Sequence, residues 1–132
     1  MKVVLDTNVL VSGIFSKGVP SRIVRAWLNN DFTVFASTEI LDEYLRVIER
    51  LKQSKTPQLD HDWPAVLQEL CHVLQVSRFP RPLCRDPSDD KFLACALTAK
   101  ANLLVSGDAD LRVLDTQFPF RIVSPRNFLD HL

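Results

Sequence analysis

Four acidic residues from distant parts of the sequence stand where their carboxylates could act on one substrate. Two follow short apolar runs, and two lie in patterns of helical period. In chain order they are Asp6, Glu43, Asp89 and Asp108. Carboxylate oxygens are the ligands that hard cations such as Mg²⁺ and Mn²⁺ prefer. A cation held in this way neutralises a phosphodiester and activates water, so the four acids predict metal-assisted phosphodiester hydrolysis.

These acids can act together only if the fold gathers them, and the alternation of predicted elements indicates how it does so. Short apolar runs predict strands at residues 3–5, 32–36, 73–76, 103–105 and 121–123. Helical patterns lie between them at residues 20–29, 38–52, 62–70 and 87–100. Alternating strands and helices indicate a mainly parallel five-stranded sheet covered by helices on both faces. We therefore expect a single α/β domain over residues 1–132.

Asp6 and Asp108 each come at the end of a predicted strand. Parallel sheets bind ligands beyond the carboxyl ends of their strands, so both acids are well placed for chemistry. Each also has a structural alternative, because aspartate after a strand forms turns or caps a following helix. Two such acids, on strands that could be neighbours, favour the functional interpretation.

Glu43 is the acid of the predicted helix 38–52 that is best placed to reach the edge of the sheet. The apolar side chains of this helix form one stripe, made of Ile40, Leu41, Tyr44, Val47, Ile48 and Leu51. Glu43 lies about 100° from the centre of that stripe, whereas Asp42 points farther away. The alternative is a solvated side chain on the flank of the helix.

The last predicted helix contains two neighbouring acids that its geometry distinguishes. Asp86 can cap the helix and Pro87 suits its first position. Asp89 shares a face with Phe92, whereas Asp90 is rotated by about 100° toward the edge. Asp89 could instead complete a capping box begun by Asp86. A carboxylate on an apolar face needs a partner, and a metal ion would supply one.

Composition and charge narrow the class of protein. The 16 basic and 16 acidic residues give zero net charge, which argues against a broad basic face that coats nucleic acid. Basic residues still cluster at 46–55 and 78–85, where phosphate contact and ordinary solvated surface are both open interpretations. No apolar run reaches the roughly 18 residues that span a bilayer, and the apolar start of the chain is too short for a signal peptide. A cytoplasmic protein without membrane contact is expected.

The cysteines and histidines do not indicate a second reactive site. The spacing of Cys71, Cys84 and Cys95 matches no zinc pattern. Cys71 and Cys95 lie among apolar residues and are expected in the core, whereas Cys84 lies in a segment rich in proline and arginine and is expected to be exposed. The three histidines lie far from the acidic motifs.

The order of the motifs resembles the PIN-domain family, and most closely its VapC-like branch, the toxin components of bacterial toxin–antitoxin pairs. The matching motifs are Asp6-Thr7-Asn8-Val9-Leu10, the helical Glu43, Asp86-Pro87-Ser88-Asp89-Asp90 leading into Phe92-Leu93-Ala94, and Val105-Ser106-Gly107-Asp108-Ala109-Asp110-Leu111. The resemblance covers nearly the whole chain and implies a small Rossmann-like, three-layer α/β/α sandwich. It also implies an acidic Mg²⁺ or Mn²⁺ pocket, endoribonuclease activity on RNA and a cognate antitoxin, and it is compatible with a homodimer.

The resemblance carries over to single positions. The four family acids fall, in order, on Asp6, Glu43, Asp89 and Asp108. Four further positions are supporting or alternative: Asn8, Asp90, Ser106 and Asp110. Asn8 and Ser106 match polar positions of the family, while Asp90 and Asp110 are the alternatives to the third and fourth acids. The polar segment 52–62 departs from many relatives and receives no role.

Two other functions are compatible with strand-end acids. A receiver-like phosphotransfer domain needs an acid after its third strand, where Val76-Ser77-Arg78 supplies none. An aspartyl-nucleophile phosphatase needs a second acid at the position of Asn8. A degenerate PIN-like domain would bind RNA or protein without cutting it, since a fold can outlast its site. The presence of all four acids argues against this last interpretation.

Overall fold

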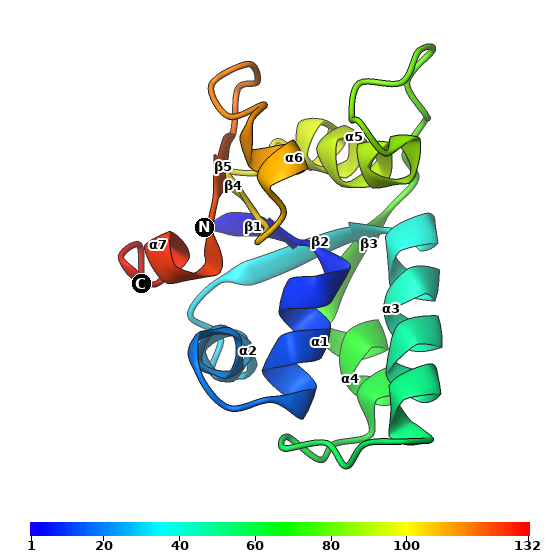
Figure 1. Cartoon of the computed structure of the whole chain (residues 1–132), viewed down its shortest axis with the longest axis vertical. Coiled ribbons are helices and arrows are strands. Elements are labelled where there is room, and N and C mark those ends of the chain that lie inside the picture. The colour runs from blue at the N-terminus through cyan, green and yellow to red at the C-terminus, as the bar shows by residue number, and fades with distance from the viewer.

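The computed structural model describes residues 1–132 as one parallel sheet of five strands with helices on both faces (Figure 1). The strands are β1 (Lys2–Leu5), β2 (Thr33–Ser37), β3 (Cys71–Leu74), β4 (Leu103–Val105) and β5 (Arg121–Val123). The helices are α1 (Thr7–Phe15), α2 (Val19–Leu28), α3 (Thr38–Lys52), α4 (Trp63–Leu70), the 3₁₀ turn η1 (Pro87–Asp89), α5 (Asp90–Ala99), α6 (Ala109–Arg112) and α7 (Pro125–Leu129). None of these helices has the length and apolar content needed to cross a bilayer. The predicted fold class is confirmed.

Strand β1 lies at the centre of the sheet, whose strand order is β3-β2-β1-β4-β5. Its Val3, Val4 and Leu5 are fully buried, and both neighbours pair with it in parallel. The chain first builds outward from β1 to β3, and then returns to the other side of β1 through β4 and β5. In such sheets a ligand crevice opens at the carboxyl ends of the strands where the order reverses. The reversal lies between β1 and β4, the two strands that Asp6 and Asp108 follow.

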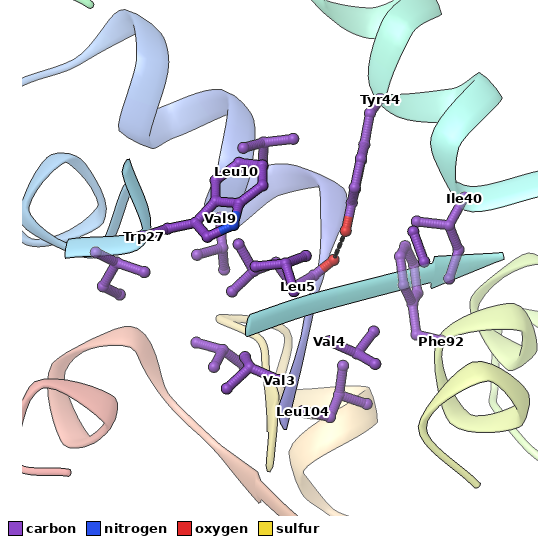
Figure 2. Close-up of a cluster of buried hydrophobic side chains, with 14 of the residues drawn as sticks. Val3, Val4, Leu5, Val9, Leu10, Trp27, Ile40, Tyr44, Phe92 and Leu104 are labelled. Carbon is purple, nitrogen blue, oxygen red and sulfur yellow. Dashed lines mark hydrogen bonds between the residues drawn. The ribbon is translucent and has the colours of Figure 1, made fainter. Parts of the chain in front are cut away.

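Helix α3 is fixed to the end of β1 by a buried hydrogen bond. Figure 1 shows α1, α2, α3 and α4 on one side of the sheet and α5 on the other. The Tyr44 hydroxyl of α3 donates to the Leu5 carbonyl at the end of β1 (Figure 2). Tyr44 lies in the middle of α3 and is fully buried, so this contact sets how α3 lies against the strand. It brings the preceding residue, Glu43, toward the residue that follows Leu5, which is Asp6.

The sequence pattern does not predict helix α1. Seven of its nine residues are buried, so it has no polar face and lacks the amphipathic period by which a helix is recognised. Valine, isoleucine, threonine and glycine are also weak helix formers, so packing rather than propensity holds this helix. The Asp6 side chain accepts from the Asn8 backbone N–H at 3.3 Å and caps α1, which was its structural alternative.

Several other boundaries differ from the predicted ones. Strand β3 begins two residues earlier, at Cys71, because α4 runs into it without a loop. The predicted helix 87–100 begins as a 3₁₀ turn and ends at Lys100, whose φ of 52° is left-handed. The short helices α6 and α7 were not predicted, since four or five residues carry too little period to recognise.

The polar segment 52–62 has a structural role that its sequence does not reveal. The backbone N–H groups of Gln58 and Leu59 donate to the Ile14 carbonyl at 2.8 and 3.0 Å. Leu59 is buried, and its own carbonyl accepts from the Trp63 indole at 2.9 Å. The segment therefore satisfies a carbonyl at the end of α1 and connects that helix to α4.

Helices α1 and α2 approach closely at Gly13, which gives a testable requirement for a small residue. A Cβ added there would meet the Val24 side chain and lie 2.6 Å from the Pro20 carbonyl oxygen. We expect Gly13→Ala to lower the free energy of unfolding by about 1–2 kcal/mol through overpacking, despite the higher helix propensity of alanine. Gly107→Ala is the matched control, because an added Cβ there meets nothing within 4 Å. Urea unfolding of both variants checks this, and equal midpoints would contradict it.

Candidate active site

Asp6 is a buried carboxylate held in one orientation at the end of β1. It is 6% exposed, and its Oδ2 accepts from the Ser106 hydroxyl at 2.6 Å. Burial raises the pKa of Asp6; the hydrogen bonds from Ser106 and Asn8 oppose this rise, while the charges of Asp108 and Glu43 add to it. The structure thus presents a buried acid whose charge other acids disfavour.

Ser106 connects the ends of β1 and β4. Its hydroxyl donates to Asp6 and accepts from the backbone N–H of Asp108 at 3.0 Å. The Asp108 side chain accepts from the Asp110 N–H at 2.9 Å and caps α6. Asp110 instead has a side chain 47% exposed, with an oxygen 4.0 Å from Arg85. Of these two acids, Asp108 lies near enough to raise the pKa of both Asp6 and Asp89.

Asp89 lies opposite the strand ends and has no hydrogen-bond partner for its carboxylate. Burial, followed by the charges of Asp6, Asp86 and Asp108, raises its pKa to about 6, against a smaller lowering effect of Lys91. The capping-box alternative does not occur, because the Asp86 side chain alone caps the turn through the Ser88 N–H at 3.0 Å. Asp89 thus has a free carboxylate that lies near enough to Asp6, Asp86 and Asp108 to be influenced by their charges.

Asp90 binds the loop before it, which the sequence did not predict, and the same loop contact bears on the expected exposure of Cys84. Its carboxylate accepts from the backbone N–H groups of Leu83 and Cys84 at 2.9 and 2.7 Å. Although its partial burial works in the opposite direction, hydrogen bonds from Cys84 and Leu83 lower the pKa of Asp90. Asp90, which the sequence offers as the alternative third acid, therefore holds the preceding loop with its carboxylate. The same contact explains why Cys84 is buried and not exposed as expected.

Glu43 already has partners, which sequence reasoning missed. The Thr7 hydroxyl donates to one of its oxygens, and the Lys91 ammonium lies 3.0 Å from the other. The Lys91 side chain is only 9% exposed, and it also donates to the Ser88 carbonyl. Arg46, on the exposed side, is 4.0 Å away. Glu43 is thus compensated, unlike the three aspartates, none of which forms an ion pair.

The candidate site therefore consists of three aspartates, two after β1 and β4 and one at the end of η1, with the paired Glu43 next to them. As they stand, no three Asp, Glu, His or Cys side chains of the chain have the spacing of a metal-binding group. The donor chemistry nevertheless fits a hard divalent cation, since the groups that influence one another are all carboxylates.

Comparisons with known proteins cover the part of the chain that contains this site. A sequence model of the PIN domain matches residues 2–110, a range that contains all four acids. This chain belongs to the PIN-domain family. An uncharacterized protein of Methanocaldococcus jannaschii is 26% identical to it, over 98% of this chain and 90% of the relative. PIN domains are generally nucleases, and they typically use divalent metals.

In this PIN domain the residues that sequence reasoning missed are Thr7 and Lys91. Thr7 lies directly after Asp6, and Lys91 lies two residues after Asp89. Lys91 stands directly before the apolar face of α5, where its side chain is expected to be enclosed. Because a lysine is rarely buried without a partner, this position was the one sign in the sequence that Lys91 pairs with an acid. Nothing local in the sequence identifies Glu43 as that partner. Asn8 is exposed, and its backbone N–H rather than its side chain contacts Asp6.

The raised pKa of Asp89 predicts how stability depends on pH in the metal-free PIN domain. Its ordinary pKa is 3.8 and its folded value is about 6, so the folded state binds this proton more tightly. The resulting stabilisation is present below the unfolded value and is lost as pH rises through the folded one. We expect Asp89→Asn in EDTA to melt above wild type at neutral pH, with the difference disappearing near pH 4. Asp42→Asn, on the exposed side of α3, is the control. A pH-independent difference for Asp89→Asn would contradict the prediction.

Proposed function

We propose that this PIN domain is an Mg²⁺- or Mn²⁺-dependent endoribonuclease. The observation that carries the proposal is the grouping of Asp6, Asp89 and Asp108, none of which has an ion-pair partner. Besides burial, the charge of Asp108 raises the pKa of Asp6, and the charges of Asp6 and Asp108 raise the pKa of Asp89. Placing acids together without compensating cations is unfavourable, and a divalent ion would remove that cost.

The chain's own residues have distinct tasks in this proposal. A bound divalent cation would neutralise the substrate phosphate and activate water. Asp6, Asp89 and Asp108 would hold it through their oxygens, and Glu43 would join them by exchanging its contact with Lys91. The Ser106 hydroxyl fixes the Asp6 carboxylate, so that this ligand does not have to be oriented during binding.

Because the sequence resembles VapC-like proteins, we also propose a cellular role: the chain is the toxin of a toxin–antitoxin pair. A cognate antitoxin would restrain it, and a homodimer is compatible with this role. Expression of the wild-type chain should then arrest growth, while Asp6→Asn should not, and an adjacent small gene should relieve the arrest. Growth unaffected by wild-type expression would remove the toxin role and leave the nuclease proposal to its own test.

One observation favours a second candidate, an RNA- or protein-binding domain without cleavage. The Lys91 ammonium occupies the place on Glu43 that a metal would need. If this contact is permanent, one family acid is unavailable and the site is degenerate. Metal titration separates the two candidates, because only the nuclease requires the acids to bind a cation.

The deciding experiment combines melting and cleavage on the same preparation. Mn²⁺ should raise the melting temperature, since a ligand at a hundred times its Kd stabilises by about 2.7 kcal/mol. Cleavage of a single-stranded RNA should stop in EDTA and return with Mn²⁺. Asp6→Asn should lose both responses, whereas Asp42→Asn should keep both. A melting temperature unmoved by Mn²⁺ in wild type would remove the metal site, and RNA that stays intact would favour the binding domain.

A further inference from the structure

A groove of about 540 Å³ lies beside the acidic centre and is not used by the function proposed above. Its walls come from the start of α3, from the loop that follows β3 and from the turn formed by η1 and the start of α5. Its volume falls within the range of small-molecule sites in proteins. Most of its lining residues are polar, so it is not a site for a purely apolar ligand.

The groove and the acidic centre share a wall. On the turn that starts α5, Ser88, Asp90 and Lys91 line the groove, while Asp89 between them does not line it and lies within the influence of Asp6 and Asp108. The Lys91 ammonium reaches from this wall to Glu43 at 3.0 Å. A ligand that extends from the acidic centre across this short turn therefore enters the groove directly.

The opposite wall of the groove contains a guanidinium group and an aromatic ring, both of which can bind a nucleotide. Arg78 lines the groove with a side chain 86% exposed, and its guanidinium donates to Glu39 at 3.2 Å. Phe79 next to it is half-buried and packs against the core, which fixes its ring. Gln75 and Ser77 add hydrogen-bonding groups. Unpaired RNA bases are bound by stacking on aromatic rings and guanidinium planes together with hydrogen bonds to their edges.

We propose that this groove binds a flanking nucleotide of single-stranded RNA whose neighbouring phosphate lies at the acidic centre. The inference rests on the proposed function and adds the subsite that the strand occupies beyond the cut. Phe79 and Arg78 stack the base or contact its phosphate, and Lys91 stands where groove and acidic centre meet. Of the basic residues in the segment 78–85, Arg78 thereby gains a specific role in place of general surface charge.

The test is binding of a fluorescein-labelled single-stranded RNA of eight nucleotides, followed by anisotropy over a series of salt concentrations. All proteins carry Asp89→Asn so that the RNA stays intact. Phe79→Leu keeps an apolar side chain against the core while removing the ring, and should weaken binding about tenfold. Arg78→Ala should weaken binding and reduce the dependence of affinity on salt.

Two matched controls separate the groove from general surface effects. Arg50 is an exposed arginine of α3 about 16 Å along the helix from the groove end, so Arg50→Ala should bind RNA as the parent does. Phe118 is half-buried, outside the groove, and stacked on Phe120, so Phe118→Leu controls for loss of a ring. Melting temperatures close to the parent's show that each variant is folded.

The outcomes are distinct. Weaker binding in both groove variants, with unchanged controls, supports the subsite. RNA bound equally by the parent and the groove variants overturns the subsite alone and leaves the groove to a different occupant, such as a protein partner. RNA bound by none of the proteins overturns the RNA substrate of the proposed function, and the subsite with it.

Discussion

Asp89→Asn is expected to reduce RNA cleavage at least about a hundredfold, the scale of losing one preorganised charged group. Its carboxylate lies near Asp6 and Asp108, whose charges act on it, and it has no structural hydrogen bond to lose. Asparagine keeps the size of the side chain, so the fold should stay intact. Asp90→Asn is expected to lose no more than about tenfold, because its carboxylate faces the loop and acts on the site only indirectly.

The stabilities of the two variants should run in the opposite order. Asp90→Asn weakens the contacts to the N–H groups of Leu83 and Cys84, and should lower the free energy of unfolding by about 1–3 kcal/mol. Asp89→Asn removes a repelled charge and should not lower it. Initial cleavage rates at saturating Mn²⁺, with urea unfolding of the same samples, give both comparisons. An inactive Asp90→Asn beside an active Asp89→Asn would show that the wrong acid has been placed at the centre.

Lys91→Met is expected to destabilise the metal-free protein and to increase its response to metal. The substitution keeps the apolar stem and removes the ammonium that compensates Glu43. Loss of one partner of a largely buried ion pair leaves the other charge uncompensated, and here the partly exposed Glu43 keeps its Thr7 contact. We therefore expect a loss of about 1–3 kcal/mol in EDTA. Mn²⁺ should recover part of it, because Glu43 is then free to bind the cation.

A double-variant cycle isolates this effect from loss of packing. In the Glu43→Gln background the Lys91→Met substitution removes no ion pair, so its additional destabilisation should be smaller. The metal response gained by Lys91→Met should also disappear there. Additive melting changes across the four proteins would mean that the 3.0 Å contact contributes no coupling. Lys91→Arg should retain the pair but fit its enclosed position less well.

The elements that the sequence predicts best are those with local start signals. Helix α3 has the predicted bounds because the Ser37 hydroxyl caps it through the Ile40 N–H at 3.1 Å and a continuous apolar stripe follows. Strands β4 and β5 also have the predicted bounds, each as a short apolar run. Helix α1 was not predicted, because it is buried on nearly all sides and so lacks the alternation of apolar and polar residues that identifies an amphipathic helix.

In the candidate site, too, the residues that could be predicted are those with a local signal, and the contacts between residues far apart in the sequence could not be predicted. The acids after β1 and β4 could be named from the sequence, because the rule for parallel sheets is topological and needs only their strands. The choice of Asp89 over Asp90 as the third acid rests on helical geometry and stays a prediction, because Asp89 lies in the 3₁₀ turn η1 just before α5. The partners of Glu43 could not be predicted, since Thr7 and Lys91 lie 36 and 48 residues from it and meet it only in the folded chain. The task of Asp90 depends in the same way on the path of a loop.

Because β1 lies at the centre of the sheet, the two sides of the sheet form at different times while the chain is being translated. Asp6 is synthesised 102 residues before Asp108, an interval of about 5–20 s at common rates of translation. Strands β1, β2 and β3 with α1 to α4 can pack during this interval, but the other side of β1 stays open until β4 has been made. Until β4 has been made, a nascent chain carries Asp6 and Glu43, and later Asp89, but never Asp108. On the proposed function, each molecule is thus harmless to RNA near the ribosome that is making it until its last acid has been added.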